Sequence, residues 1–151
     1  MKFSIEHRND IGQQVLVYLP EECSFYTGER AGNKIDLELI LNKLSLSVVE
    51  DKIIDVNGFC GIDKSMLSNV QLHEYKKGIL KVEHNLDFGF AYGINDEDLP
   101  VYVNIQTGWV CIGNPEKKGN AVEFINNCVA VIDDDKEFVS LWLKPQSLPN
   151  I

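Results

Sequence analysis

Three histidines, His7, His73 and His84, are the side chains of this sequence best suited to acid–base chemistry near neutral pH. A cysteine–histidine nucleophile pair would need one of them beside a thiolate, and no local motif around a cysteine favours such a pair. His84 lies on the apolar face of a predicted strand, where a histidine is most often a hydrogen-bonded core or cleft residue. His7 and His73 lie in polar surroundings typical of the surface.

Motifs for hydrolysis, phosphate binding and metal binding are missing from the sequence. There is no G-x-S-x-G elbow, and Gly89, Gly93, Gly108 and Gly113 stand in β-type sequence rather than before a helix. No cysteines have C-x-x-C spacing, and the run 95–98 lacks the spaced ligands of a calcium loop. We therefore expect no enzymatic activity and no cofactor or metal. The sequence leaves open a catalytic pair of carboxylates such as glycosidases use, since the two members of such a pair come from distant positions in the chain.

Acidic residues outnumber basic ones by 23 to 14, which gives a net charge of -9. Such a chain repels nucleic acid and anionic membranes and attracts basic partners. The densest acidic stretches follow predicted strand ends, so we expect partner contacts there; the alternative is a solvated loop and a solvated hairpin tip. The predicted partner-binding residues are Asp96, Glu97, Asp98, Asp133, Asp134, Asp135 and Glu137.

The four cysteines, Cys23, Cys60, Cys111 and Cys128, are predicted to be free thiols, because three of them have the apolar flanks of buried strands. Residues 1–10 contain no apolar signal segment, and no run of about 18 apolar residues could form a transmembrane helix. These features predict a cytoplasmic protein with reduced thiols.

The fold is predicted to be α+β, mainly an antiparallel sheet with one to three short helices, in a single β-rich domain spanning residues 1–151. Strict alternation predicts a long strand over Leu80–Tyr92, with Gly89 as a candidate bulge or bend. Because thirteen residues is long for a strand, a bend or two shorter strands is the alternative. Further strands are expected at Gln14–Leu19, Leu44–Val48, Ile53–Phe59, Val101–Ile105, Trp109–Ile112, Val129–Ile132 and Phe138–Leu143.

Three segments of the sequence have the spacing of a short helix. Leu37, Ile40, Leu41 and Leu44 fit a helical stripe, while Ile35, Leu37, Leu39 and Leu41 fit a strand; the poverty in β-branched residues favours a short helix. Two further segments, Lys64–Lys77 and Asn120–Asn127, have roughly helical spacing. Trp142 has a parity opposite to that of Val139, Leu141 and Leu143, so it lies either on an exposed contact face or under a covering helix or loop.

The C-terminal half has a recognisable pattern of strands and turns, formed by Val101–Asn104, Thr107–Gly113, Val122–Ile125 and Leu141–Pro145. Over residues 79–149 this pattern resembles small bacterial immunity proteins found beside polymorphic or contact-dependent growth inhibition toxins. The resemblance implies a stoichiometric inhibitor of one cognate toxin domain and supplies no functional residues. A basic, nuclease-type toxin fits the acidic charge. The alternatives are a small-ligand-binding or enzymatic β-rich domain, and an assembly or regulatory module.

Overall fold

The computed structural model describes residues 1–28 and 34–151, and its regular structure is almost entirely β. The strands are β1 (Lys2–His7), β2 (Val17–Leu19), β3 (Ser24–Tyr26), β4 (Leu37–Leu41), β5 (Leu44–Val49), β6 (Lys52–Phe59), β7 (Lys76–Glu83), β8 (Ala91–Gly93), β9 (Val101–Val103), β10 (Val110–Gly113), β11 (Asn120–Ile125), β12 (Cys128–Ile132) and β13 (Phe138–Leu143). One 3₁₀ turn, η1, spans Lys64–Met66. The predicted α+β class is therefore wrong: the described residues contain no α-helix.

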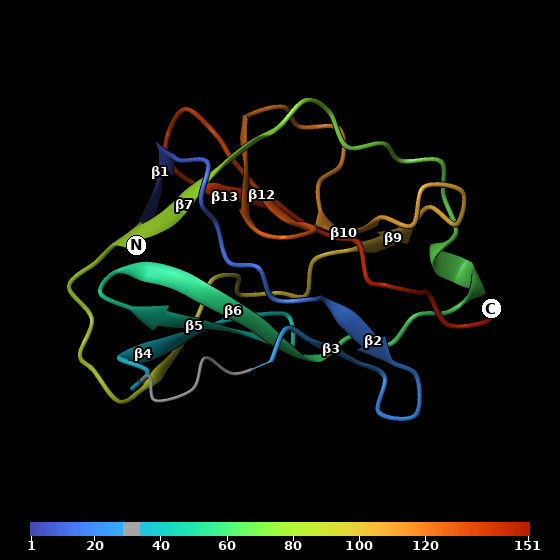
Figure 1. The fold of residues 1–151 in the computed structure, drawn as a ribbon, viewed down its shortest axis with the longest axis horizontal. Coiled ribbons are helices and arrows are strands. Elements are labelled where there is room, and N and C mark those ends of the chain that lie inside the picture. The colour runs from blue at the N-terminus through green and yellow to red at the C-terminus, as the bar shows by residue number, and fades with distance from the viewer. Residues whose placement is uncertain (29–33) are drawn as a thin grey trace.

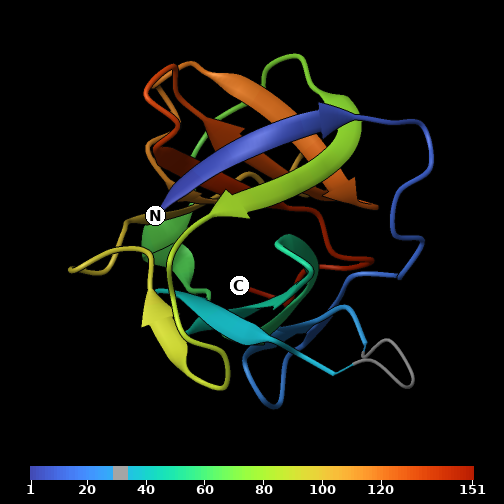
Figure 2. The ribbon, with the colours of Figure 1, turned by 90° about the vertical axis from the view of Figure 1, so that its left-hand side faces the viewer.

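The strands curl into two layers, which Figures 1 and 2 show from two sides. The path runs β8-β4-β5-β6-β7-β11-β12-β13-β10-β9, with β1 added to β7 and the β2–β3 hairpin added to β6. We call β2–β6 together with β8 the first layer and β9–β13 the second. Strand β7, with β1 along it, joins them, because its first residues pair in parallel with β11 and its Lys81 pairs with Lys52 of β6.

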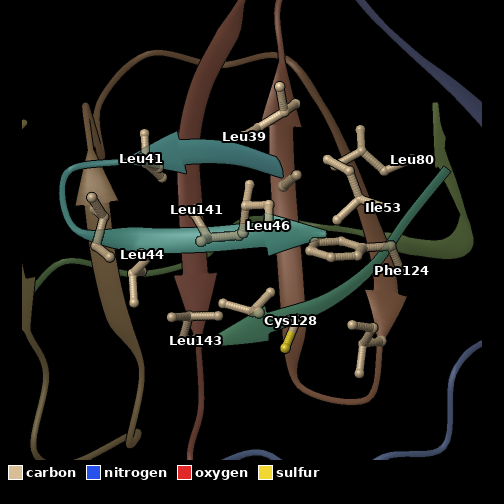
Figure 3. Packing of buried hydrophobic residues seen from close by; sticks show 14 of the residues in the cluster. Leu39, Leu41, Leu44, Leu46, Ile53, Leu80, Phe124, Cys128, Leu141 and Leu143 are labelled. Carbon is tan, nitrogen blue, oxygen red and sulfur yellow. The ribbon is translucent and has the colours of Figure 1, made fainter. Parts of the chain in front are cut away.

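The main core lies between the layers. Figure 3 shows leucines of β4 and β5 facing apolar side chains of β11, β12 and β13. Leu39, Leu46 and Leu141 are fully buried there. Successive side chains of a strand point to opposite faces of the sheet, so the inward-facing leucines of β4 and β5 recur at every second residue.

The second layer is covered on its outer face as well. Trp142 is 2% exposed and packs in a smaller cluster with Cys111 and Val129. Val70 and Leu72, from the segment before β7, close this cluster. Trp142 is thus buried under a loop, which excludes the exposed-face alternative. Burial on both faces explains why β12 is a continuous apolar run and why β13 is apolar except at Ser140.

Three expected helices are strands or loops. Residues 37–41 form β4, because a hairpin turn at Asn42, with φ 54°, returns the chain into β5 and buries alternate leucines. Residues 120–125 form β11; the Glu123 carboxylate accepts the N–H of Asn127 and holds the hairpin turn into β12. In Lys64–Lys77 only η1 is regular before β7 begins at Lys76.

The long strand predicted over Leu80–Tyr92 is also wrong. The chain leaves the sheet after Glu83, and β8 begins only at Ala91. His84 diverts it, because its Nδ1 accepts the N–H of Leu86 at 3.0 Å and its Nε2 lies 2.9 Å from Asp51 Oδ1. Gly89, with φ +88°, then turns the chain toward β4.

The predicted strands at Leu44–Val48, Ile53–Phe59, Val101–Ile105, Trp109–Ile112, Val129–Ile132 and Phe138–Leu143 correspond to β5, β6, β9, β10, β12 and β13 within a few residues at each end. Gln14–Leu19 is shorter than expected and is strand only from Val17. Across the described ranges, no helix has the length and apolarity needed to cross a bilayer.

Candidate partner-binding surface

The loop between β8 and β9 carries the first predicted acidic stretch on an ordered backbone. Asn42 Oδ1 accepts the N–H of Leu99 at 2.8 Å and the amide of Asn95 at 3.1 Å. Asn42 Nδ2 in turn donates to the Leu99 carbonyl, and Asn95 Oδ1 accepts the N–H of Asn42. Two asparagines from different segments therefore fix the loop without using its carboxylates.

Those carboxylates all face solvent. Asp96, Glu97 and Asp98 are exposed, and their side chains make no hydrogen bond or ion pair with the described residues. Three negative charges held on a fixed backbone, which no ion pair among the described residues engages, are available to a partner.

An apolar hollow of about 540 Å³ adjoins this loop. Its lining includes Asp63, Asp98, Phe59, Met66 and Leu99, and also Lys43, whose Nζ lies 5.3 Å from the centroid of the Phe59 ring. Such a hollow suits a lysine or arginine, whose aliphatic stem packs on apolar side chains while its charged end meets carboxylates.

The second acidic stretch, between β12 and β13, is built differently. Asp133 Oδ1 accepts the N–H groups of Asp135 at 3.0 Å and Glu137 at 2.9 Å, and Oδ2 lies 3.0 Å from Lys117 Nζ. The backbone N–H of Glu137, followed by the Lys117 ammonium, lowers the pKa of Asp133. Asp133 therefore organises the turn.

The same turn is tied to β1 and β7. Glu137 forms an ion pair with Lys2 of β1, which raises the pKa of Lys2, and Lys136 lies 2.9 Å from Glu83 of β7. Of the predicted acidic residues here, Asp134 and Asp135 are exposed with side chains unpaired among the described residues. The structure thus separates free carboxylates from carboxylates that hold the fold.

The two acidic stretches are anchored to different parts of the molecule. Residues 96–98 lie beside the β4–β5 turn, through Asn42, whereas residues 133–137 lie beside β1 and β7. Within residues 1–28 and 34–151, no hydrogen bond or ion pair joins one stretch to the other. They form two surfaces rather than one.

His84 has a structural position. Because its Nδ1 accepts the Leu86 N–H, the proton lies on Nε2 and is donated to Asp51. The imidazole is 6% exposed. Tyr92 donates its hydroxyl to the Asp87 carbonyl rather than to His84. In the described ranges no cluster of three or more histidine, cysteine, aspartate or glutamate side chains could hold a metal ion.

All four cysteines are free. Cys60, Cys111 and Cys128 are buried, and burial raises the pKa of Cys60 to about 11 and that of Cys111 to about 12, while the pKa of Cys128 is raised further. A thiol with so high a pKa is a poor nucleophile at neutral pH.

Sequence reasoning missed two groups of residues at the β8 edge. Asn42 and Asn95 hold the acidic loop, and Phe88 and Phe90 stand exposed beside β8. One signal was available: the segment 82–116 contains no lysine or arginine. A scan against known protein-family models finds no match for this chain, and no curated protein matches its sequence.

Proposed function

We propose that this protein is a cytoplasmic, non-enzymatic immunity protein, which binds and neutralises a cognate, basic, nuclease-type toxin domain. The observation that carries the proposal is the loop 95–99, where two asparagines fix the backbone and three carboxylates remain exposed. Those carboxylates give the protein an ordered anionic surface.

A nuclease holds phosphates with lysine and arginine side chains. Carboxylates presented on a fixed loop compete for the same cations, and the net charge of -9 steers a basic partner toward the complex. Because the loop is ordered before binding, association loses less conformational entropy than a mobile acidic tail would. The adjoining hollow at Asp98 and Phe59 adds apolar contact.

The test is protection from a candidate toxin, namely the C-terminal domain of a large secreted protein encoded beside this gene. Co-expression with the wild-type protein should restore growth, and the purified protein should inhibit the toxin's nuclease activity at a 1:1 ratio. Wild-type protein that forms no complex with this domain and gives no protection contradicts the proposal.

Matched variants locate the effect. Asp96→Asn with Asp98→Asn removes two charges from the fixed loop and should weaken inhibition about tenfold. Asp134→Asn with Asp135→Asn removes two charges from the other stretch and should change inhibition less than about twofold. Asn42→Ala keeps every carboxylate but releases the loop, and an intermediate loss is expected with an unchanged fold.

A second candidate function has one observation in its favour. A hollow of about 450 Å³ on the outer face of the second layer has an apolar floor at Trp142 and Leu72 and cationic side chains at Lys117 and Lys118. Its size is that of small-molecule sites. Glu74 also lines it and Lys117 is paired with Asp133, so Lys118 is the cation that favours an anionic ligand. Saturable quenching of tryptophan fluorescence by a small anionic aromatic compound, abolished by Ala121→Trp, would support this function.

A further inference from the structure

Two phenylalanines stand in solvent beside β8. Phe88 and Phe90 are each 64% exposed. Ile35 is 44% exposed, and the next residue, Asp36, accepts the N–H of Gly89. Single exposed apolar residues are ordinary, but a group of large apolar side chains on one surface is typical of an interaction site. Phenylalanine is also enriched at the centres of protein interfaces.

The turn that carries these rings is held to β4. The N–H of Gly89 donates to the Asp36 carbonyl at 2.7 Å, and the N–H of Glu38 donates to the Phe90 carbonyl at 3.1 Å. The Tyr92 hydroxyl donates to the Asp87 carbonyl at 3.0 Å. The rings are therefore presented on a fixed backbone and not on a free loop, which lowers the entropy lost on binding.

Carboxylates lie at both ends of β8. Asp36 Oδ2 accepts the N–H of Glu50, and Asp51 accepts a hydrogen bond from His84, so the segments 34–38, 50–51 and 84–90 meet at one end of β8, while residues 95–98 lie at its other end beside Asn42. Their acidic residues are Asp36, Glu38, Glu50, Asp51, Asp87, Asp96, Glu97 and Asp98, and their basic ones are Lys34 and His84. This charge pattern is complementary to a lysine- or arginine-rich partner.

Strand β8 also has an open side. It ends the strand order and pairs, among the described strands, with β4 alone. Phe90 O and Ile94 N bond to β4, so alternation directs the N–H and C=O groups of Ala91 and Gly93 away from it. Figure 2 shows β8, in yellow, at the margin of the layer. Unpaired groups of this kind can accept an added strand.

We propose that this edge docks an extended, basic strand of a protein partner. Main-chain hydrogen bonds to Ala91 and Gly93 align the strand, Phe88 and Phe90 bury against its apolar side chains, and the carboxylates at the two ends of β8 bind its lysines or arginines. This inference takes one point from the proposed function, namely that the partner is basic.

The probe is a capped eight-residue peptide of alternating lysine and valine, titrated into ¹⁵N-labelled protein and followed by NMR. Shifts concentrated in residues 36–38 and 87–98 are expected, and the same peptide with glutamate in place of lysine should not bind. Shifts concentrated at residues 133–137, or spread over all acidic loops, overturn the proposal. So do concentration-dependent shifts at the β8 edge without peptide, which would identify a second copy of the chain as the occupant.

Variants give a second readout. Phe88→Ser with Phe90→Ser should weaken the peptide at least tenfold, while Ile105→Ser, at a side chain 55% exposed in the β9–β10 turn, should leave affinity unchanged. Unchanged affinity of the double variant overturns the proposal, and the wild-type shift map decides it if that variant fails to fold. Peptide binding at the edge without toxin inhibition contradicts the proposed function alone.

Discussion

The β12–β13 hairpin of the second layer and the β8 edge of the first layer each carry an acidic stretch, but they use it differently. In the hairpin, both faces are buried, and Asp133 is engaged by backbone N–H groups and Lys117. At the β8 edge, asparagines order the loop, and Asp96–Asp98 face solvent without partners among the described residues. Asp134 and Asp135 of the hairpin are free as well, but only the β8 edge combines free carboxylates with exposed phenylalanines and an open strand side, and this combination is what favours it as the binding surface.

The largest expected difference between the regions is in stability. Trp142→Ala removes a ring that is 2% exposed and leaves the hydroxyl of Ser140 without its Nε1–H donor, so the free energy of unfolding should fall by about 3–5 kcal/mol. Phe88→Ala, at a side chain 64% exposed, should change it by less than about 0.5 kcal/mol. Urea unfolding of both variants checks this; equal losses would show that Phe88 belongs to the core.

Thiol reactivity should report the same contrast between covered and open regions. Cys23 is half-buried, whereas Cys60, Cys111 and Cys128 are buried with raised pKa values. In native protein at pH 8, Cys23 should react with a disulfide reagent about a hundredfold faster than the other three. Four thiols should titrate after denaturation without reductant. Rapid native reaction of Cys111 or Cys128 would mean that the second layer opens readily.

The acidic turn of the hairpin should affect stability where the β8 loop does not. Asp133→Ala leaves the N–H groups of Asp135 and Glu137 without their acceptor, and Tm should fall by about 3 °C. Asp96→Ala is the matched control and should shift Tm by less than about 1 °C. A larger shift for Asp96→Ala than for Asp133→Ala would reverse the assignment of the two stretches.

The same residue predicts a pH dependence. The pKa of Asp133 is lowered from 3.8 in the folded protein, so its stabilisation is complete above that value. Below it the unfolded chain binds the proton first, and stability is lost as the pH falls through the folded pKa. The stability difference between the wild type and Asp133→Asn should therefore shrink between pH 5 and pH 2.5 in thermal melts. A constant difference would contradict an engaged carboxylate.

Sequence patterns predicted the hairpin well and the β8 edge poorly. Strands buried on both faces are continuous apolar runs bounded by turn residues, so Phe138–Leu143 was predicted with its observed ends. At the edge, the alternation of Leu80–Tyr92 continues past Glu83, but side-chain hydrogen bonds of His84 end the strand there. The pattern placed Phe88 and Phe90 on the core face, and the turn at Gly89 exposes them instead.

The prediction of a helix at Leu37–Leu44 was wrong for a related reason. Leucines at 37, 39 and 41 satisfy a strand, and those at 37, 41 and 44 a helix, so local periodicity could not decide. Pairing of β4 with both β5 and β8 decided it, and that pairing is a tertiary effect. Both acidic stretches were found from composition, but which carboxylates accept backbone N–H groups depends on the turn geometry.

The most direct test of the contrast is the association rate with the candidate toxin domain, measured for two charge-matched variants at about 50 mM and 300 mM salt. Asp96→Asn with Asp98→Asn should slow association about tenfold at low salt and reduce its salt dependence. Asp134→Asn with Asp135→Asn should stay within about twofold of the wild type. The reverse order, or equal rates for both variants, would contradict the claim that the β8 edge is the binding surface.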